Sequence, residues 1–415
     1  MKMRAFGRLL PAATARSRTL AAVRPIASIE SVGLDDALGR VAAGAVRADR
    51  PIPAFARATW DGYAVRSPDL RDAGPGRPVR LTIIGEIFAE DRLGRPLRAG
   101  ETAAIATGAQ LPKGADAVEI FEEVEEGEGW IGVRRRVAKG ARVAPPGDDF
   151  AVGARVVAKG EVLTPAGLGG LGAIGRRAVR VYRRPRVAIV PNGNELVPPG
   201  APLAPGQIRE SNNRTLSALV RAAGGEPDPR PPVPDDPQRL EAALRSALLT
   251  HDAVIATGGS SVGEHDYLPT VFPRIGRLLF HGIAVRPGKP TLAAVAGGKL
   301  LLGMPGHPTS CLANGYWFLL PVLRRLARLP GPGWIDRTAV LDRPAGRLTP
   351  HLSTVVPLHV DGDRARPTFR DSSAITSLSQ ANAFALLPPG AGPLPAGKRI
   401  DVHLLPPPLG VFPRP

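Results

Sequence analysis

The chain has 415 residues, of which 43% are hydrophobic and 22% charged, and its formal net charge is +17. This length is too great for one hydrophobic core and predicts two to four domains, and no apolar run is long enough to span a bilayer, which excludes a transmembrane protein. The basic residues are spread along the chain and aromatic residues make up only 5%, so a nucleic-acid interface is not predicted. The single cysteine, Cys311, excludes an internal disulfide framework and indicates a reducing compartment.

The first 24 residues are basic and rich in alanine and leucine. A transit peptide has a similar composition, but the segment lacks the long apolar stretch of a secretion signal. The spacing of its leucines, with Pro25 near the end, favours an ordinary first helix. We therefore expect a cytoplasmic protein without a membrane partner.

Residues 46–153 have the pattern of a mostly β domain. Short runs rich in valine and isoleucine alternate with glycines and prolines, which predicts strands joined by turns. The predicted strands are Val79–Ile84, Thr102–Ala106, Ala117–Glu122 and Trp130–Val133. A short glycine-flanked helix at 163–175 is expected to return the chain toward its first helix. Residues 1–45 and 154–183 are accordingly predicted to form a discontinuous linking domain.

Residues 184–329 alternate between strand and helix patterns, which predicts a mostly parallel α/β sheet. Asp236 is expected to cap one helix because Pro237 then takes its first position. After Pro330 the pattern is strand-like again, so residues 330–415 are predicted to form a small C-terminal β domain. Strands are expected at 186–190, 252–256, 278–285 and 300–303, and helices at 215–223, from 237 and at 308–329.

The most informative segment directly follows the strand at 252–256. Residues 257–263 (TGGSSVG) contain three glycines and three hydroxyl side chains. At the carboxyl end of a strand, such a loop lets the backbone approach a ligand closely and direct N–H groups at an anion. Asp266 follows, where its carboxylate can accept hydrogen bonds from the N–H groups of a heterocycle. The glycine spacing matches neither the Walker nor the Rossmann pattern, and the glycines alone are equally consistent with a ligand-free turn.

Four further motifs accompany this loop. They are TWDGYA at 59–64, GAQLPKGADAV at 108–118, RPGKP at 286–290 and GMPGHPTS at 303–310. In this order, and together with TGGSSVGEHD at 257–266, they resemble the molybdopterin molybdenumtransferase family, which includes MoeA and the gephyrin E-domain. The resemblance covers roughly residues 20–405. Molybdopterin adenylyltransferases share the pterin signature, but TWDGYA, RPGKP and the additional domains argue against that alternative.

This resemblance implies an enzyme of molybdenum cofactor biosynthesis. It implies a homodimer with a composite active site that inserts molybdate into adenylylated molybdopterin and releases AMP and molybdenum cofactor. Molybdopterin adenylyltransferase and client molybdoenzymes are further implied partners, and nucleic acid is not one. A non-catalytic paralogue that binds and hands on the pterin is the alternative. The implied pterin and nucleotide site comprises Thr257, Gly258, Gly259, Ser261, Gly263 and Asp266.

Asp61, Asp149 and Lys289 are the implied catalytic residues. The resemblance places Asp61 in the active site that a partner subunit completes, although Asp-Gly is also a common turn sequence. Lys289 lies in a loop stiffened by prolines and presents a compact charge that suits a small oxyanion. The implied molybdate site comprises Arg286, Lys289, Ser310 and Ser372.

Mg²⁺ is the implied cofactor, because pyrophosphate-linked substrates are commonly bound together with a divalent cation. Glu195 and Asp235 are its implied ligands, although Glu195 is also consistent with a loop carboxylate in water. The chain departs from the family where Ala144–Pro146 stands in place of an arginine, and Arg142 is then the nearest cation. His307, between a glycine and a proline, is expected to be a turn residue rather than a metal ligand.

Overall fold

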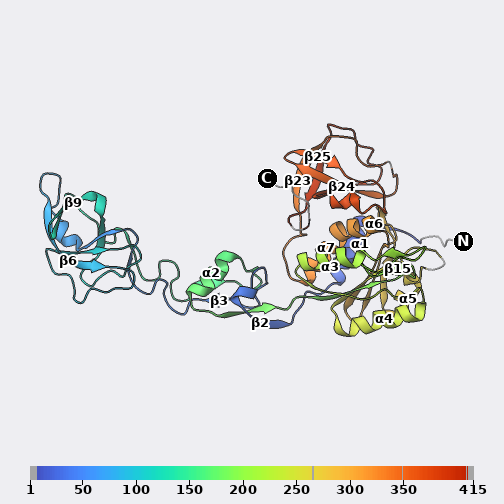
Figure 1. Cartoon of the computed structure of the whole chain (residues 1–415), viewed down its shortest axis with the longest axis horizontal. Helices are drawn as coiled ribbons and strands as arrows, with labels where there is room; N and C mark the ends of the chain where they lie inside the picture. Colours follow the sequence, from blue (N-terminus) through green and yellow to red (C-terminus); the bar gives the residue numbers. More distant parts are fainter. Residues whose placement is uncertain (1–6, 264–265, 348, 408, 410–415) are drawn as a thin grey trace. The chain divides into compact units, whose positions relative to one another are not determined.

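The structure is a computed structural model that describes residues 7–263, 266–347, 349–407 and 409. The chain divides into two compact units (Figure 1). Unit 1 comprises Met1–Glu30, Gly39–Val41 and Tyr182–Pro415, and unit 2 comprises Ser31–Leu38 and Ala42–Val181. None of the helices within the described residues is long and apolar enough to cross a membrane. The four domains predicted from the sequence are a finer division, which stays a prediction.

A six-stranded sheet forms the centre of unit 1, in the order β17-β14-β18-β22-β21-β19. The first four strands are parallel, whereas β21 and β19 run antiparallel to their neighbours. This arrangement confirms the predicted mostly parallel α/β fold. The strands are β14 (Arg186–Pro191), β17 (Glu226–Pro229), β18 (Ala253–Thr257), β19 (Arg277–His281), β21 (Leu292–Ala296) and β22 (Lys299–Met304).

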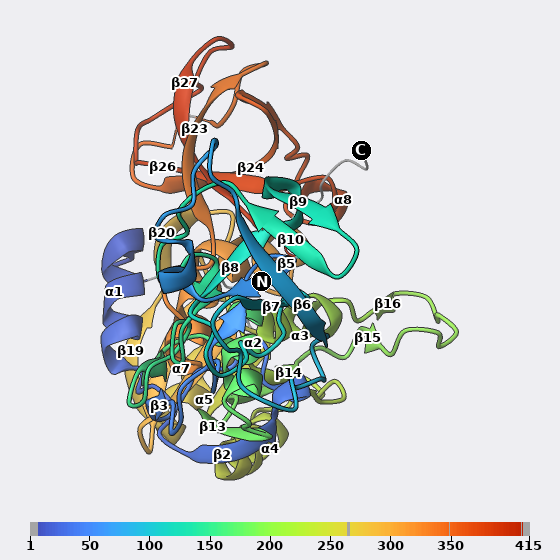
Figure 2. The same ribbon diagram turned by 90° about the vertical axis from the view of Figure 1, so that its left-hand side faces the viewer.

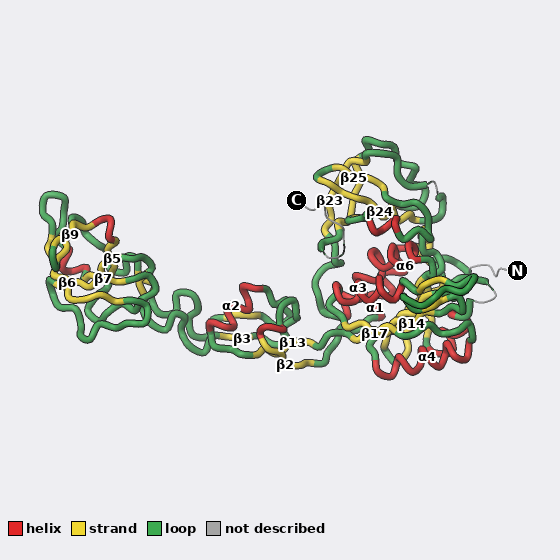
Figure 3. The backbone as a smooth tube through the Cα atoms, viewed as in Figure 1, coloured by secondary structure: helices red, strands yellow, loops and turns green. Residues whose placement is uncertain are grey.

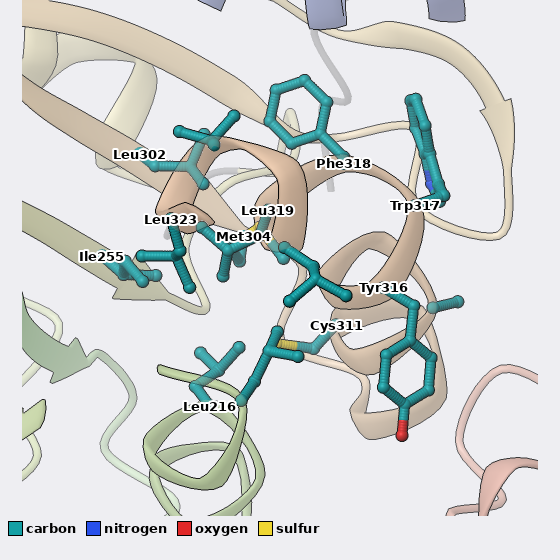
Figure 4. Packing of buried hydrophobic residues seen from close by; sticks show 14 of the residues in the cluster. Leu216, Ile255, Leu302, Met304, Cys311, Tyr316, Trp317, Phe318, Leu319 and Leu323 are labelled. Atoms are coloured by element: carbon teal, nitrogen blue, oxygen red, sulfur yellow. The ribbon is translucent and has the colours of Figure 1, made fainter. Parts of the chain in front are cut away.

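Helices cover both faces of this sheet because its central strands are apolar on both faces. Along β18, Ala253 and Ile255 pack into one core, and Val254 and Ala256 pack into the other. The first core contains residues of α1, α3, α6 and α7 and is shown around Met304 in Figure 4, and the second contains residues of α4 and α5. The helices are α1 (Ala12–Ala22), α3 (Asn212–Ala222), α4 (Pro237–Thr250), α5 (Leu268–Ile275), α6 (Pro308–Asn314) and α7 (Leu320–Leu326).

The helix starts follow capping chemistry only in part. Asp236 caps α4 as predicted, with its carboxylate accepting a hydrogen bond from the Arg239 N–H at 2.7 Å. Ser211 precedes α3 but makes no side-chain cap, and Glu210 instead accepts from the Asn213 N–H at 2.8 Å. The single helix expected at 308–329 is divided, because a π-helical segment at Gly315–Leu319 separates α6 from α7.

The prediction of a single strand at 278–285 was wrong. Gly282, at φ +94°, divides it into β19 of the central sheet and β20 (Ile283–Arg286) of a second sheet. A glycine tolerates this left-handed backbone, which lets the chain leave one sheet and enter the other. The second sheet has the order β1-β20-β24-β25-β23-β27-β26 and therefore contains strands from three parts of the sequence. Its strands are β1 (Leu10–Pro11), β20, β23 (Ile335–Leu341), β24 (Ser353–Asp361), β25 (Arg364–Pro367), β26 (Ala383–Leu387) and β27 (Arg399–Leu404).

Two small elements of unit 1 lie near the ends of these sheets. The parallel pair β15 (Leu196–Val197) and β16 (Ile208–Arg209) belongs to a segment that extends outward from the central sheet in Figure 2. A one-turn helix, α8 (Thr376–Ser379), interrupts the C-terminal strands, where no helix was expected.

Unit 2 is mostly β, as predicted, and its secondary structure is shown in Figure 3. The four predicted strands are confirmed as β6, β7, β8 and β10, and they share one sheet of order β8-β5-β7-β6-β10-β9. Helix α1 packs in unit 1, where Ala12 and Ala15 join the core of the α/β sheet, whereas α2 lies in unit 2. The sheet strands are β5 (Gly62–Val65), β6 (Val79–Ile87), β7 (Glu101–Ile105), β8 (Ala117–Ile120), β9 (Val124–Gly127) and β10 (Trp130–Val133). The remaining elements are β2 (Ile29–Gly33), β3 (Val46–Arg47), β4 (Arg57–Ala58), β11 (Val143–Ala144), β12 (Arg155–Val157), α2 (Pro165–Ala173) and β13 (Ala178–Tyr182).

Candidate active site

A tight glycine turn follows β18 at the carboxyl edge of the central sheet. Gly258 and Gly259 have φ values of +84° and +59°, a backbone region that favours glycine. A Cβ atom on Gly258 would lie 2.2 Å from the Asn192 carbonyl oxygen, and one on Gly259 would lie 2.5 Å from Asn192 Oδ1. The turn therefore needs two glycines both for its backbone conformation and for its close packing against Asn192.

The turn forms one wall of a pocket of about 970 Å³, which we call the glycine-turn pocket. Such a volume suits a substrate-sized ligand. The structure brings together here all six residues predicted for the pterin site, together with the two predicted metal ligands. These residues are Thr257, Gly258, Gly259, Ser261, Gly263, Asp266, Glu195 and Asp235.

The N–H groups of the loop are only partly available to an anion. The Gly258 N–H donates to the Met304 carbonyl at 3.3 Å, and the Gly263 N–H donates to Asp266 Oδ2 at 2.7 Å. Within the described residues, no acceptor pairs with the N–H groups of residues 259–262. The part of the predicted signature at 264–265 lies outside the described residues.

Two buried asparagines, Asn192 and Asn212, also line this pocket and were missed from the sequence. The amide nitrogen of Asn192 donates to the Val233 and Pro234 carbonyls at 3.1 Å each, and that of Asn212 donates to the Gly306 carbonyl at 2.8 Å. These bonds fix which side of each amide carries oxygen. Neither Oδ1 atom has a hydrogen-bond partner among the described residues, and both atoms are buried. The acceptors that line the pocket include the carboxylates of Glu195, Asp235 and Asp266. No sequence signal marks the two asparagine positions.

The two carboxylates predicted for Mg²⁺ both line the glycine-turn pocket. Asp235 Oδ2 accepts from the Asn194 N–H at 3.2 Å, and Asn194 Oδ1 accepts from the Asp235 N–H at 3.1 Å. The described residues contain no cluster of three or more metal-binding side chains, counting His, Cys, Asp and Glu. One or two carboxylates nevertheless fit Mg²⁺, which takes its remaining ligands from water and substrate phosphates.

A second pocket, of about 420 Å³, adjoins the first and shares Pro290 and Ser310 with it. We call it the cationic pocket. All four residues predicted for the oxyanion line it: Arg286, Lys289, Ser310 and Ser372. The sequence did not indicate two more cations there, Arg347 and Arg370, which come from the C-terminal region and carry no motif.

A buried network built on Asn314 holds the RPGKP loop. The Asn314 amide nitrogen donates to the Gly288 carbonyl at 2.9 Å and to Thr291 Oγ1 at 2.7 Å, and its oxygen accepts from Trp317 Nε1 at 2.7 Å. A Cβ atom on Gly288 would lie 2.2 Å from the same amide, so the loop packs directly on it. The backbone of Lys289 is fixed as well, because its carbonyl accepts from the Ile283 N–H at 2.9 Å.

Residues 371–372 form a further part of the wall of the cationic pocket, and Ser373 follows them. Asp371 accepts hydrogen bonds from the hydroxyl and N–H of Ser373 and from the Ala374 N–H, which hold the pKa of its carboxyl below the ordinary value. Ser372 Oγ lies 3.5 Å from His307 Nδ1. His307 directly precedes α6, as expected of a turn residue.

Cys311 is a structural residue. It is fully buried in the core beside α3 (Figure 4), and burial raises the pKa of its thiol. A thiol that stays protonated in an apolar core does not act as a nucleophile.

The predicted catalytic residues Asp61 and Asp149 belong to unit 2, whereas both pockets belong to unit 1. Asp61 Oδ1 accepts from the Thr107 N–H at 2.7 Å, and this bond holds the pKa of the exposed carboxyl below its ordinary value. Asp149 forms an ion pair with Arg57 at 3.3 Å. Arg57 therefore supplies a cation beside Asp149, while Arg142 is engaged by Glu119 at 3.4 Å.

These features define a class of protein. A parallel α/β sheet with an acceptor-rich pocket at its carboxyl edge, joined to a cationic pocket, is suited to hold a heterocycle beside small oxyanions.

Comparison with known proteins gives the family. Three family models match the chain: the MoeA N-terminal region (domain I and II) over 10–175, the probable molybdopterin binding domain over 188–325 and the MoeA C-terminal region (domain IV) over 341–405. The molybdopterin molybdenumtransferase of Bacillus subtilis (strain 168) is 35% identical over 385 residues, 91% of this chain and 90% of the relative. A crystal structure of a molybdopterin biosynthesis MoeA protein from Pyrococcus horikosii is 36% identical, covers 96% of this chain and 99% of its own, and has a TM-score of 0.82. The chain belongs to the MoeA family of molybdopterin molybdenumtransferases.

The role of the glycine turn in pterin binding can be tested with two glycine-to-alanine substitutions that should strain the backbone equally. Gly259 and Gly297 have φ values of +59° and +57°, so each change to alanine should cost roughly 1–2 kcal/mol of stability. Only Gly259→Ala also pushes against Asn192, because nothing lies within 4 Å of a Cβ on Gly297. We expect Gly259→Ala to weaken pterin binding by about tenfold or more and Gly297→Ala to leave it unchanged, measured by calorimetric titration. Equal affinities in the two variants would place the pterin elsewhere.

The Asn314 network can be tested against a second buried asparagine. Asn382 is equally buried and pairs with the Val360 N–H and carbonyl at 2.7 and 2.8 Å. Both Asn314→Ala and Asn382→Ala should lower the free energy of unfolding by about 2–4 kcal/mol, since each leaves buried groups unpaired. Only Asn314→Ala should weaken the binding of molybdate, because it alone releases the RPGKP loop. Retained molybdate affinity in a folded Asn314→Ala protein would contradict this role.

Proposed function

We propose that this chain inserts molybdate into adenylylated molybdopterin and releases AMP and molybdenum cofactor. The observation that carries the proposal is the shared wall between the two pockets, formed by Pro290 and Ser310. An acceptor-rich pocket for a heterocycle and a cationic pocket for oxyanions thereby meet at one place. Membership of the MoeA family, whose relatives bear the name molybdopterin molybdenumtransferase, supports the same reaction.

The pterin is assigned to the glycine-turn pocket. Asp266 can accept hydrogen bonds from its amino and ring N–H groups, since the Gly263 N–H engages only one carboxylate oxygen. The N–H groups of residues 259–262 then face the phosphate linked to the pterin. Glu195 and Asp235 would hold Mg²⁺, which when bound would neutralise charge on the phosphate oxygens.

Molybdate, a substrate, is assigned to the cationic pocket. Lys289 and Arg286 attract the dianion, and the hydroxyls of Ser310 and Ser372 can donate hydrogen bonds to its oxygens. The net charge of +17 also favours the approach of anionic substrates.

Asp61 and Asp149 are assigned to the site of a second copy of the chain, in a homodimer with a composite active site. An ionised Asp61 is consistent with a role in orienting a cation or a water molecule during release of AMP, and the Thr107 N–H that lowers the pKa of its carboxyl favours this charged form. We infer a cytoplasmic location, where the single cysteine stays reduced. Molybdopterin adenylyltransferase would supply the substrate and molybdoenzymes would take up the product.

The reaction is tested by measuring molybdate-dependent release of AMP from the adenylate. Release of AMP selects the enzyme, whereas pterin binding without turnover selects a non-catalytic carrier. Asp266→Asn should weaken adenylate binding by about ten- to a hundredfold at any molybdate concentration, because it leaves pterin N–H groups poorly paired. Lys289→Ala should leave pterin affinity nearly unchanged and recover activity in part at high molybdate.

Lys398→Ala is the control for lost charge, because Lys398 is exposed and lies outside both pockets. It should behave as the unmodified protein. Half-saturation by molybdate should rise with ionic strength as the attraction is screened. Equal losses of pterin binding in Asp266→Asn and Lys289→Ala, without rescue by molybdate, would refute the division of the two substrates.

The composite site is tested by mixing two variants at a molybdate concentration too low to rescue Lys289→Ala. A chain carrying Asp61→Ala and a chain carrying Lys289→Ala each lack one half of the site. Mixed dimers retain one intact site, so exchange of subunits should restore up to about a quarter of the activity if each unmodified dimer carries two sites and exchange is random. Mixtures of the same variant with itself provide the control. Absence of recovery after exchange has been verified by mass spectrometry would argue against a shared site.

A further inference from the structure

Unit 2 contains a buried carboxylate that has no part in the sites described above. Glu119 lies on β8, and its side chain is fully buried. Its two oxygens accept hydrogen bonds from Arg135 Nη2 at 2.7 Å and Arg135 Nε at 3.1 Å, and Arg142 Nη1 lies 3.4 Å from Glu119 Oε1. A buried carboxylate needs such partners, because it has lost its hydration. Both arginines are therefore tied to Glu119.

Arg142 has an unusual backbone conformation. Its φ is +55°, and among the described residues only Arg328 is also a non-glycine residue with a positive φ. A left-handed backbone is unfavourable for a residue with a Cβ atom, and it persists only where other contacts hold it. The guanidinium of Arg142 supplies such contacts, since Nη1 lies near Glu119 and donates to the Val118 carbonyl at 3.3 Å. The side chain of Arg142 therefore stabilises a backbone that is unfavourable by itself.

This backbone conformation directs a carbonyl group at the TWDGYA motif. The Arg142 carbonyl accepts a hydrogen bond from the Thr59 N–H at 3.0 Å. The neighbouring residues Val143 and Ala58 are paired between β11 and β4. Asp61 follows only two residues after Thr59, so the position of its backbone depends on how the Arg142 carbonyl is oriented.

The other side of Asp61 is held by the backbone of Glu119. Gly62 begins β5, which pairs with β8, and a Cβ atom on Gly62 would lie 2.0 Å from the Glu119 carbonyl oxygen. Only glycine allows this close approach. Asp61 thus lies between two anchored positions, one fixed by Arg142 and the other by Glu119. The ion pair between these two residues joins the anchors and closes a ring of contacts around Asp61.

We propose that Glu119 and Arg142 are positioning residues that set the Asp61 carboxylate for its part in the reaction. The part played by Asp61 itself rests on the proposed function. Neither positioning residue lines the glycine-turn pocket or the cationic pocket, so neither is assigned to bind a substrate. The Thr107 N–H, which donates to Asp61 Oδ1 at 2.7 Å, finds its acceptor only while the motif stays in place.

The first test is the substitution Arg142→Gly. Glycine adopts the left-handed backbone without steric cost, which offsets the lost ion pair and keeps unit 2 folded. We expect kcat for molybdate-dependent AMP release to fall by about ten- to a hundredfold, because a small misplacement of a reacting group costs this much in rate. The KM values for adenylate and molybdate should stay within about twofold, because both substrates are assigned to unit 1.

Arg328→Gly is the matched control. Arg328 has a φ of +61° and lies in unit 1, where its guanidinium donates to the Ile26 carbonyl and stacks on the ring of Tyr182 at 4.0 Å. The substitution removes the same side chain and relieves the same backbone conformation as Arg142→Gly. It should leave kcat within about twofold of the unmodified protein, because it leaves the contacts of Asp61 intact.

Amide hydrogen exchange in the full chain tests the positioning without the reaction. The Thr59 N–H reports the bond to the Arg142 carbonyl, and the Thr107 N–H reports the bond to Asp61. In Arg142→Gly both amides should exchange at least about fivefold faster, whereas the amides of β6 and β10 should be unchanged. A general loss of stability would instead accelerate exchange across the whole sheet of unit 2.

A second variant, Glu119→Gln, removes the charge from the other member of the pair. It should lower kcat and accelerate exchange at Thr107 in the same way as Arg142→Gly. If the two residues act as one unit, the double variant should lose no more kcat than the more impaired single variant. Fully multiplicative losses in the double variant would contradict a shared role.

The outcomes separate this inference from the proposed reaction. If AMP release stands but Arg142→Gly and Arg328→Gly have equal kcat values, the reaction stands and the inference fails. A fall in kcat without faster exchange at Thr107 would also overturn the inference. If the unmodified protein releases no AMP, the proposed reaction fails, and the exchange at Thr107 alone decides: faster exchange in Arg142→Gly supports the positioning of Asp61, and unchanged exchange overturns it.

Discussion

The position of the cationic pocket depends on one buried amide side chain. Asn314 at the end of α6 pairs its nitrogen with the Gly288 carbonyl and its oxygen with the indole of Trp317, so it joins the RPGKP loop to the π-helical segment that follows α6. A buried polar network of this kind is stabilising only when each member is paired, and therefore it defines a single arrangement. Lys289 lies on the loop and Ser310 on α6, so the same network sets the spacing between them.

The two pockets differ in charge: three carboxylates and Arg209 line the glycine-turn pocket, whereas four cations and Asp371 line the cationic pocket. The acceptors of the glycine-turn pocket follow β14 and β18 of the central sheet, whereas the cations follow β20 and the C-terminal strands. Gly282 separates β19 of the central sheet from β20 of the second sheet, since its left-handed backbone directs β20 out of the central sheet. Segregated charge of this kind can orient a ligand that carries a heterocycle at one end and phosphate at the other.

Unit 2 has its own local electrostatics around the predicted catalytic carboxylates. The Thr107 N–H lowers the pKa of the Asp61 carboxyl, and Arg57 lies beside Asp149 although the segment 144–146 lacks an arginine. The cation beside Asp149 comes from β4, which pairs with β11 (Val143–Ala144). The contact was invisible in the sequence because it joins residues 92 positions apart.

The sequence by itself determined the α/β core, the strands of unit 2, the helix cap at Asp236 and the residues of the two pockets that lie within motifs. These follow from local periodicity, capping and glycine chemistry, which act over a few residues. The tertiary structure alone decided that 278–285 divides between two sheets, that α1 packs on the α/β core, and that Arg347, Phe369 and Arg370 meet the RPGKP loop. These features depend on contacts between distant segments, where burial and charge at one position are set by neighbours that no local pattern records.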